Sequence, residues 1–397
     1  MTVTVRALRP DDREAATRLA YRAFSPTPGQ PFDPERPSVP DDRRLVAELD
    51  GRVVGHLGAW EFGHHLGGRR VPTAGICAVV VAPEVRGRGV GAALLRAGLD
   101  AARERGELLA SLFPLTRAMY RRHGFELAGA HPQVSLDTAA LTGLPAPADD
   151  VEVVPGSADD VAAMARLERE LAPGEHGMLD RCEAFVARAL TPGEHDTVVL
   201  ARRGGELTGY LVYGHAPASG DDGFYRLEVR ELVGRDADTL RSLWRVLGSS
   251  HTAAREVDVV LAPEDTLELW LPERAWRSRP TAWRWMTRLL DPAGAIAARG
   301  WPPGVEGTVE LTLTDPVWPE HDGAWELSFD GQGGGELTRG GTGRVAVDVG
   351  ALASWSTGWA SGSRLARYGR LHGATAHDLA LLDAAAAGPT PWVRSFF

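Results

Sequence analysis

The sequence has few cysteines, no excess of positive charge and no long uninterrupted apolar run. Only Cys77 and Cys182 occur among 397 residues, which excludes a disulfide framework and fits a reducing compartment. The net charge of −10 argues against general binding to nucleic acid or anionic membranes, and no His/Cys spacing predicts a metal site. No stretch approaches the roughly 18 uncharged residues of a spanning helix, and the N-terminus lacks a signal-peptide core. We therefore expect a cytoplasmic protein without nucleic-acid or membrane partners.

The length and the order of the patterns indicate several domains. A chain of 397 residues exceeds what one hydrophobic core usually serves, and its 44% hydrophobic content is ordinary for a globular protein. The dipeptide Asp50-Gly51 is a hairpin signal, residues 86–106 have helical spacing, and the proline-rich stretch 25–42 predicts a loop. Strands are predicted at residues 3–5, 44–50, 52–62, 74–81 and 108–113.

Part of the N-terminal pattern recurs after residue 150, which indicates a duplicated domain. The stretch "VTVRALRPDDREAATRLA" from Val3 resembles "VEVVPGSADDVAAMARLE" from Val151 at one constant offset, with chance similarity as the alternative. From Asp291 the composition changes to alternating strands split by glycine-rich turns, with a helix near the end. We expect an α/β (α+β) chain with domains at 1–146, 147–290 and 291–397.

A glycine-bearing turn between a buried strand and a helix is the sharpest chemical signal. Glycines in this turn let a ligand approach the backbone, and the first turn of a helix attracts an anion such as a pyrophosphate. A helix start with convenient glycines is the alternative. The order Arg86-x-x-Gly89-x-Gly91 after Ala82-Pro83 resembles the acetyl-CoA signature of GNAT acetyltransferases. That resemblance implies acetyl-CoA as the cofactor, bound by Val79, Val80, Val81, Arg86, Gly87, Arg88, Gly89, Val90 and Gly91.

The repeated half lacks this equipment. Asp236 and Asp238 stand where glycines and positive charge would be needed, and acids at a helix start serve as caps but repel a pyrophosphate. We therefore expect a GNAT-like central domain without cofactor.

Acetyl transfer to an amine needs a proton acceptor and a proton donor. Tyr120 in "RAMYRRHGF" follows the fifth predicted strand, and a phenol suits protonation of a departing thiolate; a core aromatic beside Phe125 is the alternative. Among side chains, the base candidates are Glu61, His64, His65 and His123, although "EFGHHLGG" also fits a solvated strand end.

The whole chain resembles the Eis (enhanced intracellular survival) acetyltransferase family. The similarity is carried by "VPTAG" at Val71, the loop at Arg86, "MYRRHGF", "LWRVLG", "PAGAIAARGW", "LLDAAAAG" and a final Phe. It implies tandem GNAT-like domains plus a C-terminal sterol-carrier-protein-like domain, a homo-hexamer, and a terminal carboxylate on Phe397 that acts as the base beside Tyr120. Burial beside Phe396 and Phe397 would raise the pKa of such a carboxylate toward a useful range. A tail that merely anchors the chain end is the alternative.

The sequence departs from that family at the acceptor site. The best-known members acetylate aminoglycosides and carry acids where this chain has Pro26 and Phe396. Each missing charge would weaken a polycation by about 1 kcal/mol, although Asp33, Glu35 and Glu61 are compensating candidates. We therefore expect a more apolar amine, such as an arylalkylamine, a lysine-like side chain or a peptide antibiotic. The candidate acceptor-binding residues are Phe24, Phe32, Trp60, Glu61 and Phe396.

Two other functions remain open from the sequence. The resemblance of the last domain to sterol carriers allows a lipid-binding or scaffold protein with a vestigial GNAT half. Protein lysine acetylation differs from the favoured function only in its acceptor.

Overall fold

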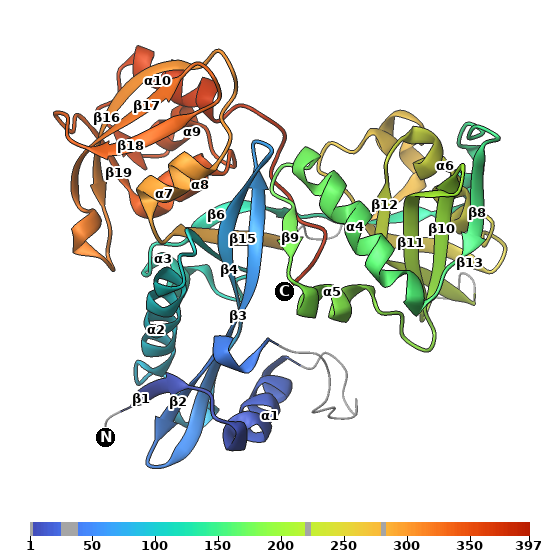
Figure 1. The fold of residues 1–397 in the computed structure, drawn as a ribbon, viewed down its shortest axis with the longest axis horizontal. Coiled ribbons are helices and arrows are strands. Elements are labelled where there is room, and N and C mark those ends of the chain that lie inside the picture. Colours follow the sequence, from blue (N-terminus) through green and yellow to red (C-terminus); the bar gives the residue numbers. More distant parts are fainter. Residues whose placement is uncertain (1–2, 25–38, 219–223, 279–282) are drawn as a thin grey trace.

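Three β-sheets, each accompanied by helices, divide the chain into three bodies (Figure 1). None of the helices in the described part of the chain is long and apolar enough to span a bilayer. The candidate residues Pro26, Phe32, Asp33 and Glu35 lie outside the described part, with most of the predicted loop. The computed structural model describes residues 3–24, 39–218, 224–278 and 283–397.

The first sheet follows the pattern predicted for the N-terminal part. Its strand order is β1-β2-β3-β4-β5-β15-β6, and β9 pairs with the second half of β3. Asp50 and Gly51 have φ of 50° and 76° between antiparallel β2 and β3, which confirms the predicted hairpin. The members are β1 (Thr4–Ala7), β2 (Arg44–Leu49), β3 (Arg52–Leu66), β4 (Arg69–Val81), β5 (Leu109–Leu112), β6 (Glu126–His131), β9 (Leu179–Arg181) and β15 (Trp283–Leu289).

Three helices accompany this sheet. The apolar side of α2 places Leu94, Leu95 and Leu99, all fully buried, in one core with Leu57 of β3 and Ile76 of β4. This packing fixes the start of α2 close to the end of β4, with residues 82–89 between them. The helices are α1 (Arg13–Phe24), α2 (Val90–Glu104) and α3 (Arg117–Arg121).

The second sheet contains the repeated half of the chain, in the order β14-β7-β13-β12-β11-β10-β8. Its strands are β7 (Gln133–Asp137), β8 (Val151–Pro155), β10 (Thr197–Arg203), β11 (Glu206–Ala216), β12 (Tyr225–Gly234), β13 (Ala254–Val260) and β14 (Trp276–Ser278). Its helices are α4 (Val161–Leu171), α5 (Glu183–Leu190) and α6 (Ala237–Gly248).

The two sheets exchange strands across the expected boundary at residue 146. Only Pro132 separates β6 of the first sheet from β7 of the second, so one extended segment serves both. In return, β15 lies between β5 and β6 of the first sheet, where Trp285, Met286 and Leu289 are fully buried. Burial of these three apolar side chains favours the pairing of β15 with the first sheet, although β15 follows the strands of the second sheet in the sequence.

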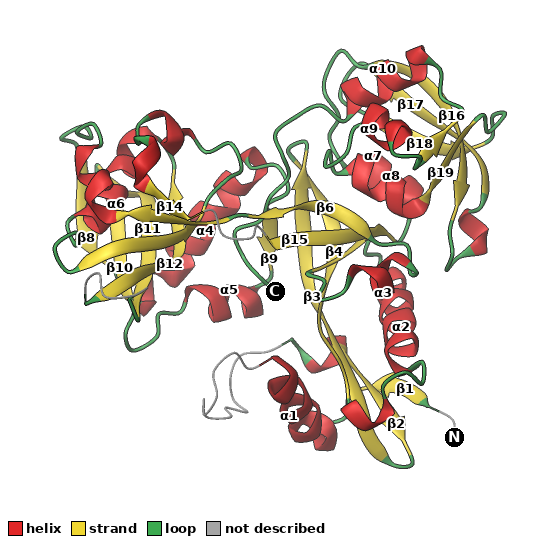
Figure 2. Ribbon diagram, turned by 180° about the vertical axis from the view of Figure 1, so that it is seen from behind, coloured by secondary structure: helices red, strands yellow, loops and turns green. Residues whose placement is uncertain are grey.

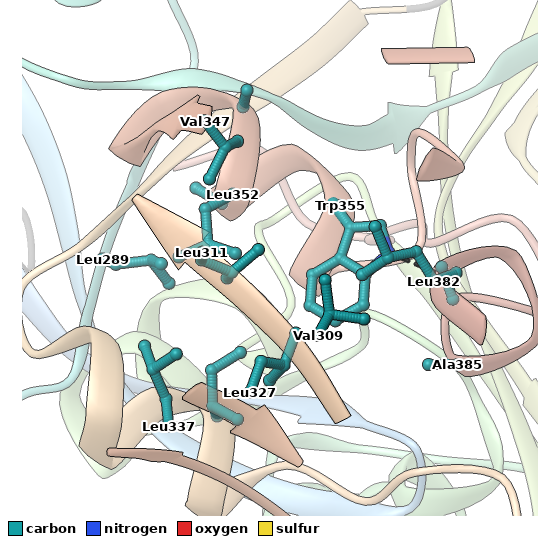
Figure 3. Packing of buried hydrophobic residues seen from close by; sticks show 14 of the residues in the cluster. Leu289, Val309, Leu311, Leu327, Leu337, Val347, Leu352, Trp355, Leu382 and Ala385 are labelled. Carbon is teal, nitrogen blue, oxygen red and sulfur yellow. Dashed lines mark hydrogen bonds between the residues drawn. The ribbon is translucent and has the colours of Figure 1, made fainter. Parts of the chain in front are cut away.

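The C-terminal body has a five-stranded sheet in the order β18-β17-β16-β19-β20. Figure 3 shows its core, in which Leu289 of β15 packs with residues such as Leu311 and Trp355. The core therefore continues from the first sheet into this body. Its strands are β16 (Glu306–Thr314), β17 (Gly323–Asp330), β18 (Gly335–Arg339), β19 (Val345–Asp348) and β20 (Leu371–His372). Its helices are α7 (Pro292–Ala298), α8 (Val349–Ser356), α9 (Gly362–Arg367) and α10 (Ala376–Ala385).

A buried ion pair also joins the first and third bodies. Arg288 of β15 donates two hydrogen bonds of 2.8 Å to Asp315, which follows β16, and both side chains are fully buried. The same guanidinium donates to the carbonyl of His123 just after α3, at 2.7 Å. His321 lies 2.8 Å from the second Asp315 oxygen. The third body therefore braces the segment that carries Tyr120.

The end of the chain leaves the third body and returns to the first sheet. Figures 1 and 2 show the tail running past β6 and ending near β9. Trp392 forms a parallel bridge with Ala130 of β6, and the Val393 amide donates to the Ala130 carbonyl at 3.0 Å. Residues 391–393 are thus held against β6 by one isolated bridge.

Candidate active site

The strands β4 and β5 separate at the centre of the first sheet. They pair in parallel only from Thr73 with Leu109 to Gly75 with Ser111, while β4 continues to Val81. Parallel strands that part in this way leave backbone donors and acceptors available on the facing edges. The described sheet therefore has an opening beyond Gly75.

A β-bulge shapes the free part of β4. The register with β3 shifts so that Ala78 and Val79 both oppose Leu57, and Ala78 has a φ of 50°. A non-glycine residue in the left-handed region is strained, and such strain concentrates at functional sites. The bulge changes the direction of the backbone at Val79, Val80 and Val81, which the resemblance to GNAT acetyltransferases assigns to acetyl-CoA binding.

The predicted phosphate loop lies immediately after this strand. Gly87 and Gly89 have φ of 76° and 82°, and a Cβ at either position would meet no atom within 4 Å. Glycine is therefore needed for backbone conformation, and the space above the backbone is open. Arg86 and Arg88 are exposed, and Arg86 donates to the Val81 carbonyl at 3.2 Å.

The start of α2 brings the loop to Tyr120. Val90 is buried, and a Cβ on Gly91 would lie 3.6 Å from Val81 and 4.0 Å from the sulfur of Met119 in α3. The loop, the end of β4 and the helix that carries Tyr120 are thus neighbours. These residues fit a pantetheine and pyrophosphate: open glycines, a helix start, two exposed guanidinium groups and a free strand edge.

Tyr120 is a buried residue of α3. Its ring lies edge-on to Phe125, with centroids 5.8 Å apart. Burial raises the pKa of the Tyr120 phenol to about 12, so the hydroxyl keeps its proton across the physiological range.

The last two residues meet the sheet at the opening. The Phe397 ring lies 5.2 Å from both Phe62 of β3 and Phe113, the residue after β5, in edge-on contacts. The Phe62 ring covers Gly75, because a Cβ there would fall 2.5 Å from it. The chain end is therefore placed where β4 and β5 part. Phe396 stacks on Phe113 at 4.2 Å.

The candidate acceptor residues divide into two groups. Trp60 is buried against Phe62 and Phe185, with centroids 6.3 and 5.1 Å away, and so belongs to the same cluster as the tail. Glu61 is exposed on β3. Phe24 is 44% exposed at the end of α1, and no ring contact joins it to the tail in the part of the chain that the structure describes.

The alternative interpretation of "EFGHHLGG" as a solvated strand end is wrong, because His64 and His65 are buried. His64 is fully buried, 2.7 Å from the Gly177 carbonyl and 3.0 Å from the Ser111 hydroxyl, and it stacks on Trp285. Burial lowers its pKa to about 4 and also lowers the pKa of His65. The reason is that β9, from the central part of the chain, covers this end of β3.

Sequence reasoning also missed three aromatic residues of the cluster. Phe62 and Phe113 lie at the ends of predicted strands, and nothing in the neighbouring sequence indicates that their rings meet the chain end. Phe185 comes from α5, in another body, and nothing in its local sequence indicates contact with Trp60 and Phe62.

The corresponding turn of the second sheet is built differently. Asp236 caps α6, since its side chain accepts from the Thr239 amide at 2.9 Å, and it pairs with Arg203 at 2.7 Å. Asp238 pairs with Arg241. Asp236 thus serves as the predicted cap, and both acids are paired with arginines.

Known proteins match each part of the chain. Models of acetyltransferase (GNAT) domains match residues 4–128 and 177–289, and a sterol carrier protein domain matches residues 292–394. An uncharacterized N-acetyltransferase from Streptomyces coelicolor is 32% identical over 399 residues, with 96% of each chain covered.

Solved structures share the complete architecture. A GCN5-related N-acetyltransferase from Anabaena variabilis has a TM-score of 0.92 at 26% identity, and Eis1 from Mycobacterium abscessus has 0.80 at 22% identity; both cover 100% of each chain. The predicted order of two GNAT-type domains and a sterol-carrier-type domain is therefore confirmed.

Proposed function

This chain belongs to the GNAT family of N-acetyltransferases and has the fold of Eis, and we propose that it acetylates an amine on an acceptor with an apolar or aromatic body. The observation that supports this proposal best is the Phe397 ring between Phe62 and Phe113, at the opening between β4 and β5. This contact supports a terminal carboxylate at the sheet opening, next to the end of β4 and the glycine loop.

The chain's own groups account for the proton transfers. Bound acetyl-CoA supplies an acyl thioester. The Phe397 carboxylate first takes a proton from the acceptor ammonium and passes it to solvent, so that the neutral amine can attack the thioester carbonyl. As the new C–N bond forms, the same carboxylate takes the second proton from the nitrogen. Tyr120 gives its proton to the sulfur as the C–S bond breaks, and solvent returns the proton from one group to the other.

Burial of the phenol sets a requirement for the proton donor. A phenol with a pKa of about 12 is a poor acid for a thiolate in water, whose conjugate pKa is about 8.5. Aromatic surroundings at the opening would disfavour the charged thiolate and so narrow this difference.

The exposed part of the aromatic cluster supports an apolar acceptor. Phe396 is 52% exposed and Trp283 45% exposed, and their rings meet edge-on at 5.6 Å. Rings of this kind favour contact with aromatic or aliphatic bodies, whereas a polycation needs several acids. Arylalkylamines, lysine-like side chains and peptide antibiotics all fit.

An acetylation panel tests the proposal. Thiol release from acetyl-CoA would be followed with phenylethylamine, tryptamine, a blocked lysine peptide, tobramycin and kanamycin. We expect the highest kcat/KM with an aromatic or aliphatic amine, and faster turnover of either aminoglycoside would contradict the acceptor class.

Removal of Phe397 should abolish turnover while acetyl-CoA binding by calorimetry persists. A truncated chain that keeps full activity would refute the role of the tail.

The lipid-carrier alternative finds no support in the core of the third body. Trp301, Phe329 and Trp355 fill its interior with mutual ring contacts of 4.9 to 6.4 Å.

The resemblance to Eis further predicts a hexamer, which sedimentation velocity would test.

A further inference from the structure

We propose that Glu168, Arg181 and Glu231 of the central body are positioning residues, which hold Arg394 and Ser395 and thereby set the place of the terminal carboxylate. The inference rests on the proposed role of the Phe397 carboxylate. It gives the central body a task in catalysis although its own turn carries acids where a cofactor would bind.

Arg181 is the centre of this cluster, and its side chain is 1% exposed. It pairs with Glu168 of α4 and donates to Glu231 of β12 at 2.6 Å. The same terminal nitrogen donates to the Ser395 hydroxyl at 2.9 Å. The Arg181 side chain therefore binds the tail at Ser395, two residues before the chain end. Glu168 and Glu231 in turn fix the position of the Arg181 guanidinium.

Arg394 brings the second positive charge from the tail itself. Its guanidinium lies 3.6 Å from Glu168 and 3.9 Å from Glu231, and its side chain is 11% exposed. The second oxygen of Glu231 is buried and accepts no hydrogen bond in the described part of the chain. Two buried carboxylates thus face two guanidinium groups, one of which is present only when the tail is docked.

Charge balance makes docking of Arg394 favourable. Without it, two carboxylates would share one guanidinium in a water-poor site, and an uncompensated buried charge is costly. The buried Tyr210 hydroxyl, which has no hydrogen-bond partner among the described residues, cannot supply the missing charge. The cluster therefore selects a cation three residues before the chain end.

The backbone connects this cluster to the opening between β4 and β5. Arg181 is the last residue of β9 and stands opposite Phe62 in the pairing of β9 with β3. The Phe62 ring in turn contacts the Phe397 ring at 5.2 Å. Arg181 thus holds the tail at Ser395 through a hydrogen bond, and the neighbouring Phe62 holds it at Phe397 through a ring contact. Together the two contacts restrict the position of the terminal carboxylate.

Carboxypeptidase A provides a readout that does not depend on activity, because it removes C-terminal aromatic residues only from an undocked tail. We expect Glu231→Gln, Arg181→Met and Arg394→Met to release Phe397 at least ten times faster than the unmodified enzyme. The matched control is Glu170→Gln, two residues after Glu168 on α4, whose exposed pair with Arg235 lies away from the tail. It should release phenylalanine at the unmodified rate.

Steady-state kinetics complete the test. The three variants should lose at least tenfold in kcat with little change in the KM for acetyl-CoA, and Arg394→Lys should recover part of the loss because it restores the charge. Unchanged phenylalanine release, or a kcat loss without faster release, would overturn the inference. Full activity of the chain lacking Phe397 would instead refute the proposed function, so the two failures are distinguishable.

Discussion

The ring of Phe397 lies edge-on against the ring of Phe62, with centroids 5.2 Å apart and planes at 75°. The two residues come from the end of the third body and from β3 of the first, and Phe62 in turn covers Gly75, the last residue of β4 that pairs with β5. Residues from the first and third bodies therefore meet at the opening between β4 and β5.

Tyr120→Phe should lower kcat by about 100-fold or more and leave the KM for acetyl-CoA nearly unchanged, because it removes a proton donor without removing the ring. Steady-state kinetics at pH 7 to 10 would measure this. Since burial raises the pKa of Tyr120 to about 12, loss of its proton should not limit the unmodified enzyme below pH 10. Tyr368→Phe is the control, since Tyr368 is 73% exposed on the third body. Equal activity of both variants would contradict the role of Tyr120.

Gly89→Ala should raise the KM for acetyl-CoA by roughly tenfold. The position has a φ of 82°, where a side chain costs about 1–2 kcal/mol, and relief of that strain would reshape the loop at the start of α2. Gly143→Ala serves as the control, because the site is equally open but its φ is not in the left-handed region. Calorimetry with coenzyme A would show the difference, and equal affinities would argue against this loop as the cofactor site.

Asp315→Asn should destabilise the protein by about 3–5 kcal/mol, because Arg288 would keep a buried charge without its partner. Differential scanning fluorimetry should show a clear fall in Tm. Glu320→Gln breaks the exposed pair with Arg103 between the same two bodies and should change the Tm little. Activity of Asp315→Asn should fall as well, because Arg288 also holds the carbonyl after α3. Similar Tm values for the two variants would refute the bracing role.

Acid should destabilise the fold through buried histidine. Burial lowers the pKa of His64 to about 4, whereas the unfolded chain has the ordinary value of about 6.5. Between these values the unfolded state binds the extra proton, so stability falls as pH drops, by about 1.4 kcal/mol per pH unit from this residue. Urea unfolding at pH 7.5, 6 and 5 would measure the change in the free energy of unfolding with pH, which should be smaller for His64→Gln. His372→Gln, at an exposed position of β20, should keep the pH dependence of the unmodified protein.

Local features of the site were predictable because they depend on a few neighbouring residues. The hairpin at Asp50-Gly51, the left-handed glycines of the loop at the start of α2 and the cap at Asp236 follow from backbone conformation and short-range hydrogen bonds. The resemblance to a known family added the order of the three domains. Neither source could show which strands are exchanged between the first two sheets.

Adjacent residues specify most strands of the first sheet, the glycine loop and the aromatic end of the chain, so these features are visible in the sequence. Long-range packing sets the contacts that the chain end makes. It buries His64 under β9, brings Phe185 from another body against Trp60, and surrounds Arg394 with acids from α4 and β12. Such contacts join segments far apart in the chain, and their energies arise from burial and charge pairing that no local pattern records.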